Sequence, residues 1–174
     1  MVCFSVKRTA VKILKYYILI PFLLIQFSSC GSETRQVNFI KIPELEEILN
    51  NSEDCLYVIN FWATWCPPCV QELPHFEKIA KEFDSSRVKF ILISVDFPSQ
   101  AEKQLEPFLK RNNITLPVSA MMETDSNLWI EKVDPEWQGD IPATLFLNNA
   151  RKIRKFNAGI LDYQELKNII NNLL

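Results

Sequence analysis

The chain has 174 residues, of which 48% are hydrophobic, and its 19 basic and 21 acidic residues give a formal net charge of −2. This length fits one domain of ordinary size. The sequence contains no internal repeat, no low-complexity run and no second-domain boundary. The slightly acidic balance lacks the basic footprint of a nucleic-acid-binding protein, so we expect no nucleic acid partner.

The first 29 residues contain four basic residues and no acidic one, and an apolar stretch of twelve residues occupies positions 16–27. A basic start followed by a short apolar stretch and small residues is typical of a secretory signal peptide. Twelve apolar residues are fewer than the roughly 20 that a membrane-spanning helix requires. An uncleaved anchor helix is the alternative.

The segment Ser28-Ser29-Cys30-Gly31 follows the apolar stretch. It resembles a bacterial lipoprotein cleavage box, with Phe27 where a leucine-like residue is usual. This resemblance implies a lipoprotein signal peptide at 1–29, and a lipidated Cys30 with a short tether at 30–36. Each buried CH₂ group of an acyl chain contributes about 0.8 kcal/mol, so more than one chain anchors a protein stably. Cleavage would leave 15 basic and 21 acidic residues, a net charge of −6.

The remaining chain alternates strand-like and helix-like patterns. Residues 56–62 are an apolar run rich in β-branched and aromatic side chains. Residues 89–95 are continuously apolar, as expected of a parallel strand buried on both faces. Pro107 should bend or shorten a helix at 100–111, and Asp162 should cap the last helix. We expect strands at 37–40, 56–62, 89–95, 116–120, 144–147 and 153–158, and helices at 43–50, 66–83, 100–111, 127–133 and 162–174.

This order, β-α-β at the start and β-β-α at the end, predicts an α/β fold with a central mixed sheet flanked by helices. The segment 61–69 reads FWATWCPPC and places Cys66 and Cys69 where the buried strand gives way to a helix. Two cysteines at this spacing and junction are typical of a redox-active pair. The helix N-terminus favours the Cys66 thiolate, so Cys66 should be the nucleophile and Cys69 the resolving thiol.

Two other roles for the cysteine pair are less consistent with the sequence. A structural zinc site normally needs a second ligand pair, and no other Cys-x-x-Cys occurs here. A purely structural disulfide that closes so short a loop removes little chain entropy. We therefore expect no bound metal and no cofactor other than a Cys66–Cys69 disulfide.

FWATWCPPC, followed by Glu72 and Pro74 and later by Ile141-Pro142-Ala143-Thr144, resembles the thioredoxin-like family. More narrowly, it is similar to the membrane-anchored thiol–disulfide oxidoreductases of the TlpA/ResA type. The resemblance covers a thioredoxin-like domain at 37–174.

The resemblance also assigns roles to residues around the cysteine pair. It implies that Glu72 influences the protonation of the cysteines, that Asn60 occupies the position of a buried aspartate in thioredoxins proper, and that Pro142 is a cis-proline. The backbone of Ile141 would then pair with an extended substrate segment. The residues expected to contact substrate are Trp65, Pro67, Pro68, Ile141 and Pro142.

Other reactive or aromatic side chains have simpler expected roles. Cys55 should be a packed thiol, Trp62 a core residue, and His75 an exposed or packed helix residue. Trp129 and Trp137 are expected in the core or in a lid rather than as ligand-binding residues.

The function implied is that of a lipid-anchored thiol–disulfide oxidoreductase in the bacterial cell envelope, facing the periplasm. It would reduce disulfides of envelope proteins, as in cytochrome c biogenesis, and a membrane thiol reductant would regenerate the dithiol. The same residues could also oxidise partner thiols. The alternative is a non-catalytic binding or adaptor lipoprotein. Copper-handling relatives of this fold use a wider cysteine spacing and a distant histidine, which this sequence does not have.

Overall fold

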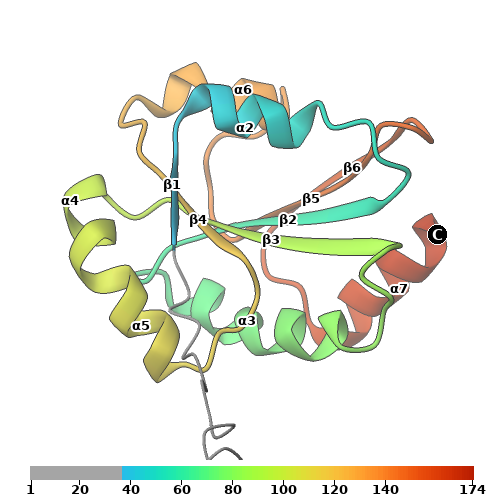
Figure 1. Cartoon of the computed structure of the whole chain (residues 1–174), viewed down its shortest axis with the longest axis horizontal. Helices are drawn as coiled ribbons and strands as arrows, with labels where there is room; N and C mark the ends of the chain where they lie inside the picture. Colours follow the sequence, from blue (N-terminus) through green and yellow to red (C-terminus); the bar gives the residue numbers. More distant parts are fainter. Residues whose placement is uncertain (1–36) are drawn as a thin grey trace, which may run out of the picture. The chain divides into compact units, whose positions relative to one another are not determined.

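The computed structural model describes residues 37–174. The predicted signal peptide at 1–29, the lipidated Cys30 and the tether at 30–36 lie outside the described residues. A mixed sheet of six strands, in the order β1-β4-β3-β2-β5-β6, forms the centre of the domain (Figure 1). Its strands are β1 Asn38–Ile40, β2 Leu56–Trp62, β3 Val88–Ser94, β4 Val118–Met121, β5 Ala143–Asn148 and β6 Ile153–Ala158.

The first four strands pair in parallel, β1 with β4, β4 with β3, and β3 with β2. The last two add antiparallel strands at the other edge, because β5 pairs with β2 and β6 with β5. The predicted α/β class with a mixed sheet is therefore confirmed. The helices are α2 Ile42–Leu49, α3 Pro67–Ala80, α4 Pro98–Gln100, α5 Glu106–Arg111, α6 Ile130–Val133 and α7 Tyr163–Leu173.

Helices cover both faces of the sheet. In Figure 1, α3 and α7 lie below the strands while α2 and α6 lie above them. A hydrophobic core lies on each face of the sheet, and strand β2 contributes side chains to both, since successive side chains of a strand point to opposite faces. Its residues Val58 and Trp62 pack with the α3 side, and Ile59 and Phe61 pack with the α2 side. This double burial explains the continuous apolar run of β2 and makes it the rigid support for the segment that follows it.

Several boundaries differ from the sequence-based expectations. Helix α3 ends at Ala80 rather than Phe83, because Asp84 organises a turn that leads directly into β3. Its carboxylate accepts from the Ser86 N–H at 2.9 Å, and its carbonyl accepts from the Val88 N–H at 3.0 Å. Strand β4 begins at Val118 rather than 116. The N–H of Leu116 donates to Glu77 instead of to a strand, and Pro117 has no N–H.

The helix expected at 100–111 is longer and less regular than predicted. It begins with α4 at Pro98, continues as a π-helical segment at Ala101–Leu105 and ends with α5. Pro107 lies in the first turn of α5, where a missing N–H is tolerated, so it does not end the helix. The prediction for α7 is confirmed, because the carboxylate of Asp162 accepts from the Glu165 N–H at 2.8 Å and caps the helix.

Candidate active site

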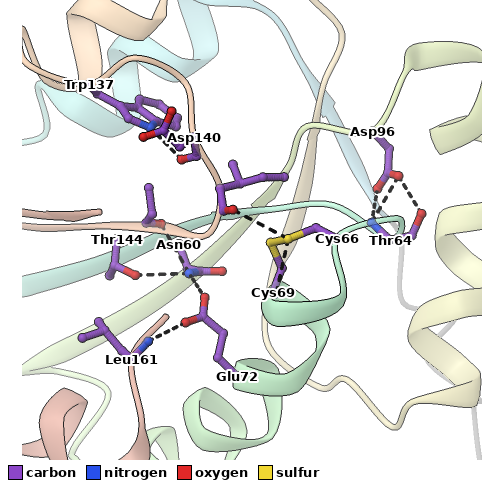
Figure 2. The surroundings of a disulfide bond; sticks show 12 residues. Asn60, Thr64, Cys66, Cys69, Glu72, Asp96, Trp137, Asp140, Thr144 and Leu161 are labelled. Atoms are coloured by element: carbon purple, nitrogen blue, oxygen red, sulfur yellow. Dashed lines mark hydrogen bonds between the residues drawn. A yellow bond between two sulfur atoms is a disulfide. The ribbon is translucent and has the colours of Figure 1, made fainter. Parts of the chain in front are cut away.

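Cys66 and Cys69 form a disulfide at the start of α3, directly after β2 (Figure 2). Cys66 is 5% exposed and Cys69 is fully buried. The remaining exposure is therefore on Cys66, as expected for the sulfur that meets a partner. The order of attack itself is not fixed by the disulfide and stays a prediction.

The first turn of α3 presents one backbone donor to Cys66. Cys66 is the N-cap residue, and its Sγ accepts from the Cys69 N–H at 3.3 Å. Pro67 and Pro68 have no N–H, and the Val70 N–H donates to the Cys66 carbonyl at 3.1 Å. A thiolate at Cys66 would thus be stabilised by one N–H and by the positive end of the helix dipole.

The loop before β5 faces the disulfide from the other side. The Ile141–Pro142 peptide bond is cis, which confirms the predicted conformation. The carbonyl oxygen of Ile141 lies 3.8 Å from Cys66 Sγ. Of the other predicted contact residues, Trp65 is 54% exposed, and Pro67 and Pro68 are also exposed. All five lie on or beside the disulfide, and their contact with substrate remains a prediction.

Glu72 lies one helical turn beyond Cys69 on α3 and is completely buried. Its Oε1 accepts from Asn60 Nδ2 at 2.7 Å, and its Oε2 accepts from the Leu161 N–H at 2.8 Å (Figure 2). Burial away from water raises the pKa of Glu72 to about 7, although the two hydrogen bonds oppose that rise. Glu72 can therefore hold or release a proton near neutral pH.

Asn60, on β2, joins Glu72 to the sheet. Its Nδ2 also lies 3.1 Å from Thr144 Oγ1 and 3.3 Å from the Ala143 carbonyl. Its Oδ1 is buried and has no hydrogen-bond partner within residues 37–174. Because Asn60 carries no charge, this position supplies no carboxylate, and Glu72 is the buried acid beside the cysteine pair.

The structure adds one residue that the sequence analysis missed. Asp96 follows β3, is 2% exposed, and holds the segment that leads to Cys66. Its Oδ1 accepts from the Thr64 hydroxyl at 2.6 Å, its Oδ2 accepts from the Ser94 hydroxyl at 2.7 Å, and both oxygens face the Thr64 N–H. An acid placed directly after the continuous apolar run of β3 was the available clue, since parallel strands bring their carboxyl ends to one edge.

The remaining predictions concern packing. Cys55 is a buried free thiol whose pKa is raised by burial, and Trp62 is fully buried, as expected for both. Trp129 and Trp137 are buried and contact each other and Phe61 through their rings. Within the part of the chain that the structure describes, no three His, Cys, Asp or Glu side chains group as a metal site. Over the same residues, no helix is long and apolar enough to cross a membrane.

A mixed sheet of this order, with a redox disulfide at the first helical turn after its central strand, is the architecture of the thioredoxin-like thiol–disulfide oxidoreductases. The chain belongs to the AhpC/TSA family, whose model matches residues 42–156.

Similar proteins are named for the same chemistry. The chain is 27% identical over 162 residues to sporulation thiol-disulfide oxidoreductase A of Bacillus subtilis (strain 168), covering 90% of this chain and 94% of that protein. It is 29% identical over 101 residues to thiol-disulfide oxidoreductase ResA of Halalkalibacterium halodurans, covering 58% of this chain and 52% of that one. The crystal structure of StoA from Bacillus subtilis gives a TM-score of 0.54 at 28% identity, covering 67% and 82% of the two chains. The protein is a thiol–disulfide oxidoreductase, and its substrates are proteins with thiols or disulfides.

Proposed function

We propose that this protein works in the reducing direction, on disulfides of cell-envelope proteins, from a lipid-anchored position facing the periplasm. The observation that carries the exchange itself is the position of Cys66, whose Sγ lies between the N-terminus of α3 and the Ile141 carbonyl. The reducing direction rests on the resemblance to the TlpA/ResA type. A partner chain lying along Ile141 would bring its own disulfide to this sulfur. No metal or organic cofactor enters the exchange, because the two cysteines carry both electrons.

The exchange takes two steps. The Cys66 thiolate attacks one sulfur of the partner disulfide, which forms a mixed disulfide and releases the other partner sulfur as a thiolate that takes up a proton. Cys69 then loses its proton and attacks Cys66 Sγ, forming the Cys66–Cys69 disulfide and releasing the second partner thiol. Two electrons pass from the protein to the partner. A membrane thiol reductant would return two electrons and two protons to the protein.

Glu72 would control the proton of the resolving thiol. It lies three residues after Cys69, so the two side chains share one side of α3. An ionised Glu72 would disfavour a second negative charge at Cys69 and keep its proton in place until the mixed disulfide forms. With a pKa of about 7, Glu72 can also accept that proton in neutral solution.

The proposed location rests on the amino-acid sequence before the described domain. The basic start, the short apolar stretch and Ser28-Ser29-Cys30-Gly31 support lipidation of Cys30. We expect wild-type protein in the membrane fraction and unprocessed or released protein for Cys30→Ala, with Cys55→Ala as the matched control. Unchanged fractionation and an intact N-terminus for Cys30→Ala would indicate an anchor helix instead.

Two measurements test the substrate and the direction. A Cys69→Ala variant should accumulate mixed disulfides with envelope proteins through Cys66, and a Cys66→Ala/Cys69→Ala variant should accumulate none. The reduction potentials of dithiol/disulfide couples in thioredoxin-fold proteins span about −270 to −120 mV, and the potential of a reductant should lie toward the negative end of that range. The proposal would be contradicted by a reduction potential of the Cys66–Cys69 couple near the upper end of that range, together with trapped partners that are cytosolic or reduced in the cell.

A further inference from the structure

A cavity of about 360 Å³ opens beside the disulfide, on the side of the sheet covered by α2 and α6. We refer to it as the Trp65 cavity. The residues that line it include Trp65, Phe97, Glu123, Trp137 and Ile141. Its volume is at the lower end of the range for ligand pockets and is sufficient for one bulky side chain.

The cavity shares two residues with the redox site. Trp65 directly precedes Cys66 in the chain, and the Ile141 carbonyl lies 3.8 Å from Cys66 Sγ. A partner chain that offers a sulfur to Cys66 and runs along Ile141 therefore passes the mouth of the cavity. Alternate side chains of an extended segment point to the same side, so a residue close to the partner cysteine can enter it.

The wall of the cavity formed by residues 137–141 is held in place by contacts within the chain. The Trp137 indole N–H donates to the Asp140 carbonyl at 2.8 Å, which holds the loop that ends at Ile141. Gly139 has a φ of 90°, and a Cβ there would lie 2.8 Å from Ile130 Cδ1. Only glycine fits this turn without displacing the wall. A preformed apolar cavity requires little reorganisation on binding.

Two large apolar side chains at the cavity are left in contact with water. Trp65 is 54% exposed and Phe97 is 64% exposed, although most large apolar side chains of the domain are buried. Exposed apolar groups that line a groove are characteristic of binding surfaces. Aromatic residues of this kind supply much of the binding energy in protein interfaces.

The segment that walls the cavity is strongly acidic. Residues 121–141 contain six acidic residues and one basic residue, Lys132, which pairs with Glu46 at 2.8 Å. Within residues 37–174, none of these six carboxylates forms an ion pair. Asp96 also lines the cavity, but its oxygens are occupied by Thr64 and Ser94. Glu123 Oε1 accepts from the Asp125 N–H at 3.2 Å, and its Oε2 forms no hydrogen bond within residues 37–174, so Glu123 is the lining carboxylate with an oxygen available to a partner.

We propose that the Trp65 cavity selects substrate proteins in which a bulky apolar residue lies close to the target cysteine and lysine or arginine residues flank it. The apolar side chain enters between Trp65, Phe97 and Ile141. The basic side chains face Glu123 and the other acids of residues 121–141. The inference rests on the proposed function for the identity of the partner as a protein disulfide.

Binding of redox-inert peptides tests the cavity independently of the redox chemistry. Three extended peptides carry serine in place of the target cysteine and differ only in the residues that flank it. The leucine–lysine peptide has leucine and lysine there, the serine–lysine peptide has serine and lysine, and the leucine–glutamate peptide has leucine and glutamate. The purified full-length protein, with its disulfide intact, should bind the leucine–lysine peptide about tenfold or more tightly than the serine–lysine peptide in calorimetry, because one apolar side chain in a pocket is worth that factor. It should also bind the leucine–lysine peptide more tightly than the leucine–glutamate peptide, because the acidic residues at the cavity repel glutamate. Added salt should reduce the preference for lysine over glutamate and leave the preference for leucine over serine.

Matched variants connect these preferences to the cavity. Phe97→Ala should reduce the preference for leucine, and Glu123→Lys should abolish or reverse the preference for lysine. Phe39→Ala removes an exposed aromatic of β1, and Glu47→Lys reverses an exposed charge of α2, so both controls should retain the wild-type preferences. Equal binding of all three peptides, or preferences that both cavity variants leave intact, would overturn the cavity proposal.

The corresponding cysteine peptides, each joined to a small thiol by a disulfide, are then offered to the reduced protein. If the protein binds the peptides selectively but reduces none of these disulfides, the result would contradict the proposed function and support the cavity proposal. Reduction of all three at one rate, relative to a small non-peptide disulfide, would support the proposed chemistry and overturn the cavity proposal.

Discussion

The side-chain amide of Asn60 donates a hydrogen bond of 2.7 Å to the buried carboxylate of Glu72, which links β2 to α3 beneath the disulfide. Thioredoxins proper, which this sequence resembles, carry a buried acid at the position of Asn60. Here the buried acid is on the helix and the amide is on the strand. Glu72 is thus held by neutral donors alone, the Asn60 amide and the Leu161 N–H.

Glu72 should make the stability of the oxidised protein depend on pH. Its pKa is about 7 in the folded protein against an ordinary value of 4.5, so the folded state binds a proton more tightly than the unfolded state. The free energy of unfolding should therefore decrease by about 3 kcal/mol as pH rises from about 4.5 to 7, and this component should be constant above and below that window. Urea unfolding at graded pH measures the slope.

Glu72→Gln should flatten that slope, because glutamine does not titrate. The variant should also lose some stability at acidic pH, since its amide NH₂ would face the Asn60 amide or the Leu161 N–H, which are donors to the carboxylate oxygens of the wild type. Glu47→Gln, which removes an exposed carboxylate, is the control and should preserve the slope. A wild-type slope in Glu72→Gln would assign the pH dependence to another group.

Glu72→Gln should also change the chemistry of the reduced protein. Glu72 is ionised at the pH where a thiol titrates, so neutralising it should lower the pKa of Cys69 by on the order of one unit. Disulfide exchange should slow, because the resolving step loses a nearby proton acceptor. Thiol titration by absorbance and stopped-flow exchange measure both effects. Glu77→Gln provides a matched control, since that buried acid of α3 binds Thr115 and Leu116 instead. Equal effects of the two variants would show that Glu72 has only a structural role.

Cys66 should be alkylated before Cys69 in the reduced protein. Cys66 is the more exposed residue of the two and its Sγ accepts from the Cys69 N–H, so its pKa should lie below the value of about 8.5 typical of a free thiol. Mass-spectrometric mapping after short pulses of iodoacetamide at graded pH gives both the order and the titration. Faster labelling of Cys69 would exchange the roles of nucleophile and resolving thiol.

Asp96 should stabilise the segment that carries Cys66. Asp96→Asn replaces one carboxylate oxygen, which accepts hydrogen bonds from Thr64 and Ser94, by an NH₂ group that can only donate. The variant should lose stability because a buried polar group without a partner costs about 1–3 kcal/mol. Chemical unfolding measures this loss. Thr64→Ser keeps the hydroxyl donor and should remain close to wild type, whereas Thr64→Val should lose part of the same stability. Wild-type stability of both Asp96→Asn and Thr64→Val would show that these bonds do not hold the loop.

The amino-acid sequence by itself determined the elements whose causes are local. The continuous apolar run of β2, the Cys-x-x-Cys at its end and the prolines in the first turn of α3 are read directly from neighbouring residues. Asp162 and Glu165 lie three residues apart, so the cap of α7 was equally visible. The mixed sheet followed from the order of these elements, because parallel strands need crossover helices and the final hairpin does not.

The tertiary structure alone decided the properties that depend on distant residues. Glu72 has a raised pKa because the fold removes water from it, and the N–H of Leu161, 89 residues away, opposes part of that rise by donating to its carboxylate. Asp96 reaches Thr64 across 32 residues of chain, and the Trp65 cavity combines four separate segments. Desolvation and long-range contacts arise only when the strands pair and the helices pack, so no local pattern in the sequence encodes their strength.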